Sequence, residues 1–449
     1  MDIQFLGATQ TVTGSKYLIR TEQMQVLVDC GLFQGYKPLR LRNWEPLPIN
    51  PATIDYVLLS HAHIDHSGYI PLLVKNGFRG QVICTQATKE LCGLLLPDSG
   101  HLQEEDAHYA NLKGYSKHHP AAPLYTEEDA IESLRYFQSV PFDKPFAMHE
   151  GFSASFHYAG HILGAASIQL KHHDRTVLFS GDLGRSNDPI MTPPQNPPES
   201  NYLVIESTYG DRLHEPVNTE IQLGEIINQT FKRRGMVLIP AFAVGRTQSL
   251  LYYIQQLKVK KIIPDIPVYV DSPMATNATE IYSHHPNENK LDAQQCADVF
   301  GVAQYIQSVD ESIALSAQKT PMILISASGM ATGGRVVHHI KNFGTNPKNT
   351  ILFCGYQAGR TRGDRIIRSE REIKMFGQMV SIRAEVIQIG SASAHADYEE
   401  MLRWLSHLKQ APQKIFITHG NEESAQALKL KIEEKFNWQC VVPHYLDRD

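Results

Sequence analysis

Three histidines and an aspartate fall within six consecutive positions of the chain, in the stretch HAHIDH from His61 to His66. The stretch directly follows an apolar run, YVLL, which predicts a buried strand. Because side chains alternate along a strand, histidines spaced H-x-H project to one side and suit two ligands of one ion. Asp65 and His66 follow on the turn and suit a second ion, since Zn²⁺ accepts both imidazole and carboxylate. The alternative is a group of exposed loop histidines.

Three more residues of ligand type follow predicted strands elsewhere in the chain. His161 stands in YAGHILGA and Asp182 in LFSGDLG, each beside glycines that let ligands approach closely. A carboxylate has two oxygens, so Asp182 suits a bridge between two ions. His419 follows another predicted strand in IFITHGN, where a single histidine is more often structural. Taken alone, each of these three is a weak indication.

Length and composition set the broad class of protein. A chain of 449 residues predicts two domains, or one large domain with an insertion. The net charge of −5 means that any nucleic-acid binding must depend on a local basic patch. The six cysteines form no CxxC pair, which predicts reduced thiols in a cytoplasmic protein. No signal peptide is visible, and no stretch has the roughly 18 apolar residues of a membrane span.

The predicted elements must bring these distant side chains together. In the first half of the chain, four predicted strands end at polar residues, which are Asp29, Ser60 with His61, Asp182 and Glu206. Rigid sheets commonly carry catalytic groups on the loops at their strand ends. The middle of the chain alternates strand, loop and helix, as in GMVLIPAFAVGRTQSLLYYIQQL, which predicts a parallel α/β sheet. The C-terminal part repeats that alternation twice.

The motifs together resemble a known family. HAHIDH, AGHILGAA, FSGDLG and VDCG resemble the metallo-β-lactamase superfamily, and IESTYGDR, PAFAVGRTQ, VDSPMA, SASGMATGGR, SASAHAD and ITHGN its β-CASP branch, in family order. Within that branch the chain resembles bacterial relatives of the nuclease subunit of the eukaryotic cleavage and polyadenylation specificity factor. The resemblance implies an α/β fold with a metallo-β-lactamase αββα sandwich at residues 1–208 and 385–449. Residues 209–384 would form an inserted β-CASP α/β domain.

Carried over residue by residue, the resemblance implies two Zn²⁺ ions per chain. The implied ligands are His61, His63 and His161 for one ion, Asp65, His66 and His419 for the other, and Asp182 as the bridge. Asp29 would orient a ligand histidine without binding zinc itself. Glu206, His395 and His419 match the three β-CASP motifs, and a histidine in the third is typical of the RNA-processing branch.

These residues imply a zinc-dependent ribonuclease that hydrolyses single-stranded RNA through a metal-bound hydroxide, with endonuclease or 5′-exonuclease action left open. His395, polarised by Glu206, would donate the proton to the leaving oxygen. On the residues alone, His395 is instead a helix-start histidine with a solvated ring. The competing functions are a small-ester or thioester hydrolase of the same superfamily and a non-catalytic RNA-binding subunit.

Possible RNA contacts lie in the middle of the chain. Helix N-termini and basic or hydroxyl side chains there suit phosphates, and the candidates are Arg246, Ser326, Ser328, Arg335, Arg360 and Arg362. The basic stretch GRTRGDRIIRSEREIK is equally consistent with a solvated helix face bearing ion pairs. Arg360 also departs from the family pattern, which usually has glycine before the threonine. No membrane partner is expected, and the oligomeric state is not predicted.

Overall fold

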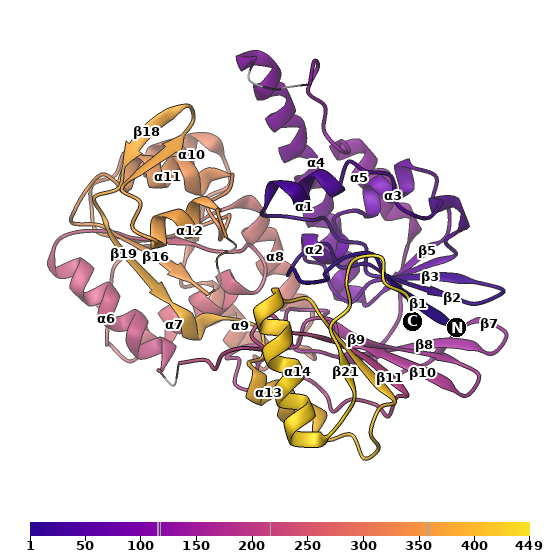
Figure 1. Cartoon of the computed structure of the whole chain (residues 1–449). Helices are drawn as coiled ribbons and strands as arrows, with labels where there is room; N and C mark the ends of the chain where they lie inside the picture. Colours follow the sequence, from indigo (N-terminus) through magenta and orange to yellow (C-terminus); the bar gives the residue numbers. More distant parts are fainter. Residues whose placement is uncertain (115, 117, 216, 356, 358) are drawn as a thin grey trace. The chain divides into compact units, whose positions relative to one another are not determined.

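A computed structural model describes residues 1–114, 116, 118–215, 217–355, 357 and 359–449 (Figure 1). Contacts within the chain divide it into two compact units. The first unit comprises Met1–Asn187, Pro193–Leu213 and His395–Asp449, and the second comprises Asp188–Thr192 and His214–Ala394. The boundaries between the units, after Leu213 and after Ala394, lie about five and ten residues beyond the predicted domain limits. The domain assignment itself stays a prediction.

Two sheets form the centre of the first unit. The first sheet has six strands in chain order, β1 (Asp2–Phe5), β2 (Tyr17–Arg20), β3 (Gln25–Val28), β4 (Tyr56–Leu58), β5 (Gln81–Cys84) and β6 (Phe137–Ser139). The second has seven strands in the order β21 (Cys440–Val441), β20 (Lys414–Thr418), β11 (Tyr202–Glu206), β10 (Arg175–Phe179), β9 (Ala166–His172), β8 (Phe152–Tyr158) and β7 (Phe146–His149). Strands β20 and β21, from the C-terminal segment, thus complete a sheet begun more than 200 residues earlier in the chain.

Alternating apolar side chains bury the facing surfaces of these two sheets. Val26 and Leu58 of the first sheet share one core with Ile168, Val204 and Phe416 of the second. The helices on the outer face of the second sheet are α13 (Tyr398–Leu405) and α14 (Glu422–Phe436), which form their own core with it. Helices α2 (Ile64–Ser67), α3 (Ile70–Lys75), α4 (Gln86–Lys113) and α5 (Glu127–Ser133) lie on the side of the first sheet (Figure 1). The predicted αββα sandwich is therefore present.

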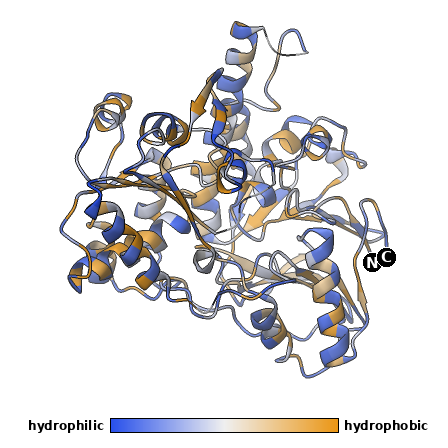
Figure 2. Cartoon of the chain, turned by 60° about the vertical axis from the view of Figure 1, so that its left-hand side comes forward, coloured by the Kyte–Doolittle hydropathy of each residue, from blue (hydrophilic) through white to orange (hydrophobic). Residues whose placement is uncertain are grey.

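The second unit contains a parallel six-stranded sheet. Its order is β14 (Gln304–Tyr305), β13 (Val268–Asp271), β15 (Ile323–Ser326), β12 (Val237–Pro240), β16 (Thr350–Cys354) and β19 (Glu385–Ile389). Its helices are α6 (Thr219–Lys232), α7 (Arg246–Val259), α8 (Pro273–His284), α9 (Ala293–Phe300), α10 (Val309–Ser316), α11 (Arg335–Phe343) and α12 (Arg362–Ile367). The connecting helices make the parallel order possible, as the strand–loop–helix pattern predicted. Figure 2 shows hydrophobic residues along the strands and mixed character along the helices.

The charged stretch that follows β16 does not form one long helix. Helix α12 ends at Ile367, and the chain then forms a hairpin of β17 (Glu372–Met375) and β18 (Gln378–Ser381). Arg360, which stands where the family pattern has glycine, adopts φ 65°, the left-handed conformation that glycine favours. Its backbone N–H donates to Asp364 Oδ2 at 2.7 Å, so the turn before α12 forms despite the larger side chain.

Helix α4 is one continuous helix. The pattern TKELCGLLL predicts a helix and the polar stretch from Pro97 is predicted to be mostly helical; in the structure α4 spans 28 residues and continues through Pro97 without a break. Within the described parts of the chain, no helix combines the length and apolarity needed to cross a membrane.

Candidate metal centre and active site

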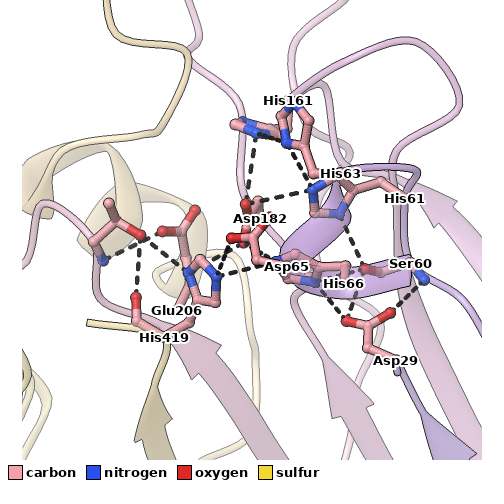
Figure 3. Close-up of polar contacts among 12 residues, drawn as sticks. Asp29, Ser60, His61, His63, Asp65, His66, His161, Asp182, Glu206 and His419 are labelled. Carbon is pink, nitrogen blue, oxygen red and sulfur yellow. Dashed lines mark hydrogen bonds and ion pairs between the residues drawn. The ribbon is translucent and has the colours of Figure 1, made fainter. Parts of the chain in front are cut away.

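Strand ends of the first unit deliver the candidate ligands to one place. Strands β10, β11 and β20 are parallel neighbours, so their carboxyl ends meet at one edge of the sheet. Asp182, Glu206 and His419 stand at or just after those ends. The HAHIDH stretch follows β4 in the facing sheet and continues into α2. Figure 3 shows these side chains pointing toward one another.

One group of four ligand atoms has the spacing of a tetrahedral zinc site. His61 Nε2 lies 3.1 Å from His63 Nδ1, and His161 Nε2 lies 3.3 Å from the same atom. Asp182 Oδ2 lies 3.5 Å from both His61 Nε2 and His161 Nε2. In a tetrahedron with zinc–ligand bonds of about 2.0–2.1 Å, the ligand atoms are about 3.3–3.4 Å apart. These four residues therefore fit one Zn²⁺ ion.

A second group meets on the other oxygen of Asp182. Oδ1 lies 3.3 Å from His66 Nε2 and 3.4 Å from the His419 ring. His66 Nε2 and His419 Nε2 are 3.0 Å apart, and Asp65 Oδ2 is 3.5 Å from His419 Nε2. Asp182 thus presents one oxygen to each group, as a bridging carboxylate must. The donor set of two imidazoles and two carboxylates fits a second divalent ion.

The protonation states of the first group suit metal binding. Burial, reinforced by the neighbouring His66, holds the pKa of His61 well below its usual value, and burial lowers the pKa of His63 to about 4. Both rings are therefore neutral at pH 7, as metal ligands must be. Burial disfavours the charged form of Asp182, but the His419 and His66 rings hold its pKa well below the ordinary range.

His66 differs from the other ligand histidines. Burial acts against its charged form, yet Asp182 and Asp29 raise its pKa well above the usual value. A metal ion at this position must displace that proton, so occupancy of the second group depends on pH.

Asp29, Ser60 and Thr208 form polar contacts around the ligand histidines. Asp29 Oδ2 accepts hydrogen bonds from His66 Nδ1 at 2.7 Å and from Ser60 Oγ at 2.9 Å, while Oδ1 accepts from Ser60 N at 2.8 Å. Thr208 Oγ1 lies 3.2 Å from His419 Nδ1. Asp29 was expected to orient a ligand histidine, and it contacts His66. The sequence offered only one signal for the roles of Ser60 and Thr208: Ser60 directly precedes HAHIDH, and Thr208 lies within IESTYGD.

His395 and Glu206 form a pair beside the two ligand groups. His395 Nδ1 lies 3.2 Å from Glu206 Oε2, and its ring centroid is 4.4 Å from that of His161. The Glu206 carboxylate also accepts hydrogen bonds from Leu183 N at 2.6 Å and Thr208 N at 3.3 Å, which fix its position. Burial disfavours the His395 imidazolium, but Glu206 outweighs it and raises the pKa of His395. Its ring is therefore not the fully solvated one that the alternative interpretation required.

The six candidate RNA contacts lie in the second unit and differ in availability. Arg335 donates to Asp271 Oδ1 at 2.6 Å and to two backbone carbonyls, and Arg362 donates to the carbonyls of Ala331 and Thr332. Ser326 is buried and donates to Asp271 O. Ser328 and Arg246 are half-buried and Arg360 is exposed. Arg335, Arg362 and Ser326 thus already stabilise the fold of their unit.

Comparison with known proteins identifies the family. The model of the metallo-beta-lactamase superfamily matches residues 11–264, more than half of the chain. Models of the Beta-Casp domain and of the Zn-dependent metallo-hydrolase RNA specificity domain match residues 247–366 and 379–443. The chain belongs to the β-CASP branch of the metallo-β-lactamase superfamily. The predicted resemblance and fold class are thereby confirmed, and this β-CASP protein is a metal-dependent hydrolase.

Relatives along the full length of the chain agree with this membership. Ribonuclease TTHA0252 of Thermus thermophilus is 33% identical over 435 residues, covering 95% of both chains. An RNase J-like protein of Methanocaldococcus jannaschii is 29% identical and covers 98% of this β-CASP protein and 97% of its own length. The transcription termination factor FttA of Methanosarcina mazei is 31% identical over 96% of this chain and 69% of its own. A solved structure of a protein of unknown function from Enterococcus faecalis shares the fold, with TM-score 0.56 and 13% identity.

Proposed function

We propose that this β-CASP protein is a zinc-dependent ribonuclease that hydrolyses phosphodiester bonds of single-stranded RNA in the cytoplasm. The observation that carries the proposal is the division of Asp182 between two ligand groups beside the His395–Glu206 pair. All seven expected ligand positions are filled with suitable residues, which disfavours a non-catalytic RNA-binding subunit. The six unpaired, buried cysteines support a reducing compartment.

Each ligand group would hold one Zn²⁺ ion. Two ions bridged by a carboxylate supply a nucleophile at neutral pH by lowering the pKa of water and neutralise charge on a phosphate. The protein's own contribution is positional: Asp29 fixes the His66 ring, Thr208 contacts the His419 ring, and Asp182 sets the spacing of the two groups.

His395 would act as the general acid. Its Nδ1 faces Glu206, which leaves Nε2 on the opposite side of the ring to donate a proton to the leaving oxygen. The raised pKa favours the protonated ring, the form that an acid catalyst requires. For phosphate contacts we propose Arg246, Ser328 and Arg360 of the second unit. Arg335, Arg362 and Ser326 already donate hydrogen bonds within the protein, so they are less available for contacts with RNA than the other three residues.

Cleavage and metal content together test this function. Wild-type protein should cleave single-stranded RNA, contain about two zinc ions per chain, and lose activity with chelator. Asp65→Ala should lower the rate by a factor of about 10³ or more, because the second ion loses a ligand. The matched control is Asp174→Ala, in the exposed turn between β9 and β10, which should change neither quantity. RNA labelled at the 5′ end and internally distinguishes endonuclease from exonuclease products.

Full activity of Asp65→Ala, or wild-type protein with negligible zinc and no cleavage after zinc addition, would contradict the proposal. Rapid hydrolysis of small esters without RNA cleavage would instead support the small-ester hydrolase.

A further inference from the structure

A groove of about 700 Å³ opens on the first unit, and no residue of the candidate metal centre lines it. One wall is the proline-rich segment that follows α1 (Lys37–Arg42), and the other includes the start of α3. The lining includes Trp44, Pro46, Pro48, Tyr69, Leu72 and Leu124. The groove is therefore mostly apolar and bounded by rigid segments.

Trp44 is unusually exposed for its residue type. Its side chain is 58% exposed, and Leu41 beside it is 48% exposed, although tryptophan is highly buried on average. The preceding residue fixes the backbone: Asn43 Oδ1 accepts from Phe33 N at 2.9 Å, and Asn43 Nδ2 donates to Phe33 O at 2.8 Å. The indole is thus presented to solvent from an anchored position, which marks a binding surface more than a packing defect.

The helix beside the groove is basic. Lys37, Arg40 and Arg42 lie on α1, which has no acidic residue in its first turn and no buried residue. Arg42 lies 4.3 Å above the Tyr445 ring, and none of the three cations forms an ion pair with another residue in the described parts of the chain. The groove lining itself adds one carboxylate, Glu45, so the local balance stays positive. An exposed indole flanked by cations is the combination that single-stranded nucleic acids bind.

We propose that this α1 groove is an accessory binding surface for single-stranded RNA. Trp44 stacks on a base, and Lys37 and Arg40 contact the flanking phosphates. The inference rests on the proposed function, because it assumes that the substrate is RNA. Tyr69 in the groove follows His66 by three residues, so their Cα atoms are within about 11 Å of each other. On this proposal the groove holds a part of a long substrate outside the reacting bond.

Steady-state kinetics with two substrate lengths test the groove. Trp44→Ala should raise KM for a ~20-nucleotide RNA roughly tenfold, the loss expected for one stacked base, with kcat changed less than twofold. KM for a ~4-nucleotide RNA should not change, because such a substrate fills only the metal centre. Arg40→Ala should raise KM for the long RNA several-fold. Leu430→Ala and Lys409→Ala, at exposed positions elsewhere in the first unit, are the matched controls.

Fluorescence supplies a readout that does not depend on turnover. Trp404 is 7% exposed and Trp438 stacks on Phe436 at 4.5 Å, so Trp44 should dominate quenching by the long RNA, and Trp44→Phe should abolish it. Equal KM values for wild type and Trp44→Ala, with quenching unchanged in Trp44→Phe, would overturn the proposal that the α1 groove binds RNA. A change of oligomeric state in Trp44→Glu without a change in KM would also overturn it, in favour of a second copy of the chain. Failure of the wild type to cleave the short RNA would count against the ribonuclease function itself.

Discussion

At the scale of single residues, the carboxylate of Glu206 decides what His395 can do. A solvated imidazole loses its proton close to pH 6.5, which would leave little acid available under neutral conditions. Glu206 raises the pKa of His395 against the effect of burial, and two backbone N–H groups hold Glu206 in place. The pair therefore favours a proton on His395, beside the ligand groups.

This coupling predicts a specific pH effect. Because a general acid must be protonated, kcat should fall as pH rises through the pKa of His395. Glu206→Gln removes the charge that raises this pKa, so the alkaline limb of the kcat profile should move to lower pH. His395→Ala should lower kcat by about 10²–10⁴ while zinc content stays at the wild-type level. An alkaline limb that Glu206→Gln leaves in place would contradict the role of the pair.

At the scale of elements, one buried carboxylate joins several parts of the second unit. Asp271, at the end of β13, accepts from His339 Nε2 and Arg335 Nη1 on α11, each at 2.6 Å, and from Ser312 Oγ on α10 at 2.5 Å. Burial raises its pKa, but the hydrogen bonds from His339, Ser312 and Arg335 lower it more, so the net shift is downward. The ionised form therefore stabilises the folded unit.

Removal of this carboxylate should destabilise the second unit selectively. Asp271→Ala leaves Arg335 and His339 without their partner, a loss of about 3–5 kcal/mol in the free energy of unfolding. All three tryptophans, Trp44, Trp404 and Trp438, lie in the first unit. Urea denaturation followed by circular dichroism should therefore show an earlier transition, while the fluorescence transition stays near the wild-type midpoint.

The pH dependence of this effect has a defined sign. Because the pKa of Asp271 is lower in the folded than in the unfolded chain, its carboxylate stabilises the fold at pH values above the unfolded-state pKa near 4. This stabilisation is lost as the pH falls through the pKa of the folded state. The difference between wild type and Asp271→Ala should thus be largest at neutral pH and shrink in acid. A stability difference between wild type and Asp271→Ala that grows in acid would contradict the stabilising role of the ionised Asp271 carboxylate.

For the whole molecule, the proposed RNA substrate is a polyanion, whereas the chain itself has a net charge of −5. A local group of cations, such as Lys37, Arg40 and Arg42 on α1, offsets the repulsion between RNA and the rest of the surface. Such binding releases counterions from the RNA, and its strength therefore depends on salt.

The salt dependence can be predicted. For single strands, the logarithm of the association constant falls by about 0.7 per neutralised phosphate for each unit of log salt concentration. The two proposed contacts of Lys37 and Arg40 contribute about −1.4 to the slope for the long RNA, and Arg40→Ala should make the slope shallower by about 0.7. Fluorescence titrations between ~50 and ~200 mM salt measure it, and a flat profile would exclude a phosphate-based interface.

By itself, the sequence determined the chemistry available and most of the elements that carry it. The H-x-H spacing after an apolar strand indicated a metal site, and strand–loop–helix alternation predicted the parallel sheet of the second unit, because both patterns are local. Hairpin β17–β18 was not predicted, since the pairing of β17 with β18 is not visible in local patterns.

The resemblance implied which ligands share an ion, but local sequence patterns do not show which distant side chains come into contact; the folded chain shows this. His419 is 353 residues from His66, and their Nε2 atoms approach to 3.0 Å because β20 pairs with β11 in one sheet. The partners of the ligands, Ser60 and Thr208, are likewise selected by distance and not by residue type. The hydrogen bond from Arg335 to Asp271 could not be predicted either, because the sequence does not show whether an arginine faces solvent or a buried carboxylate.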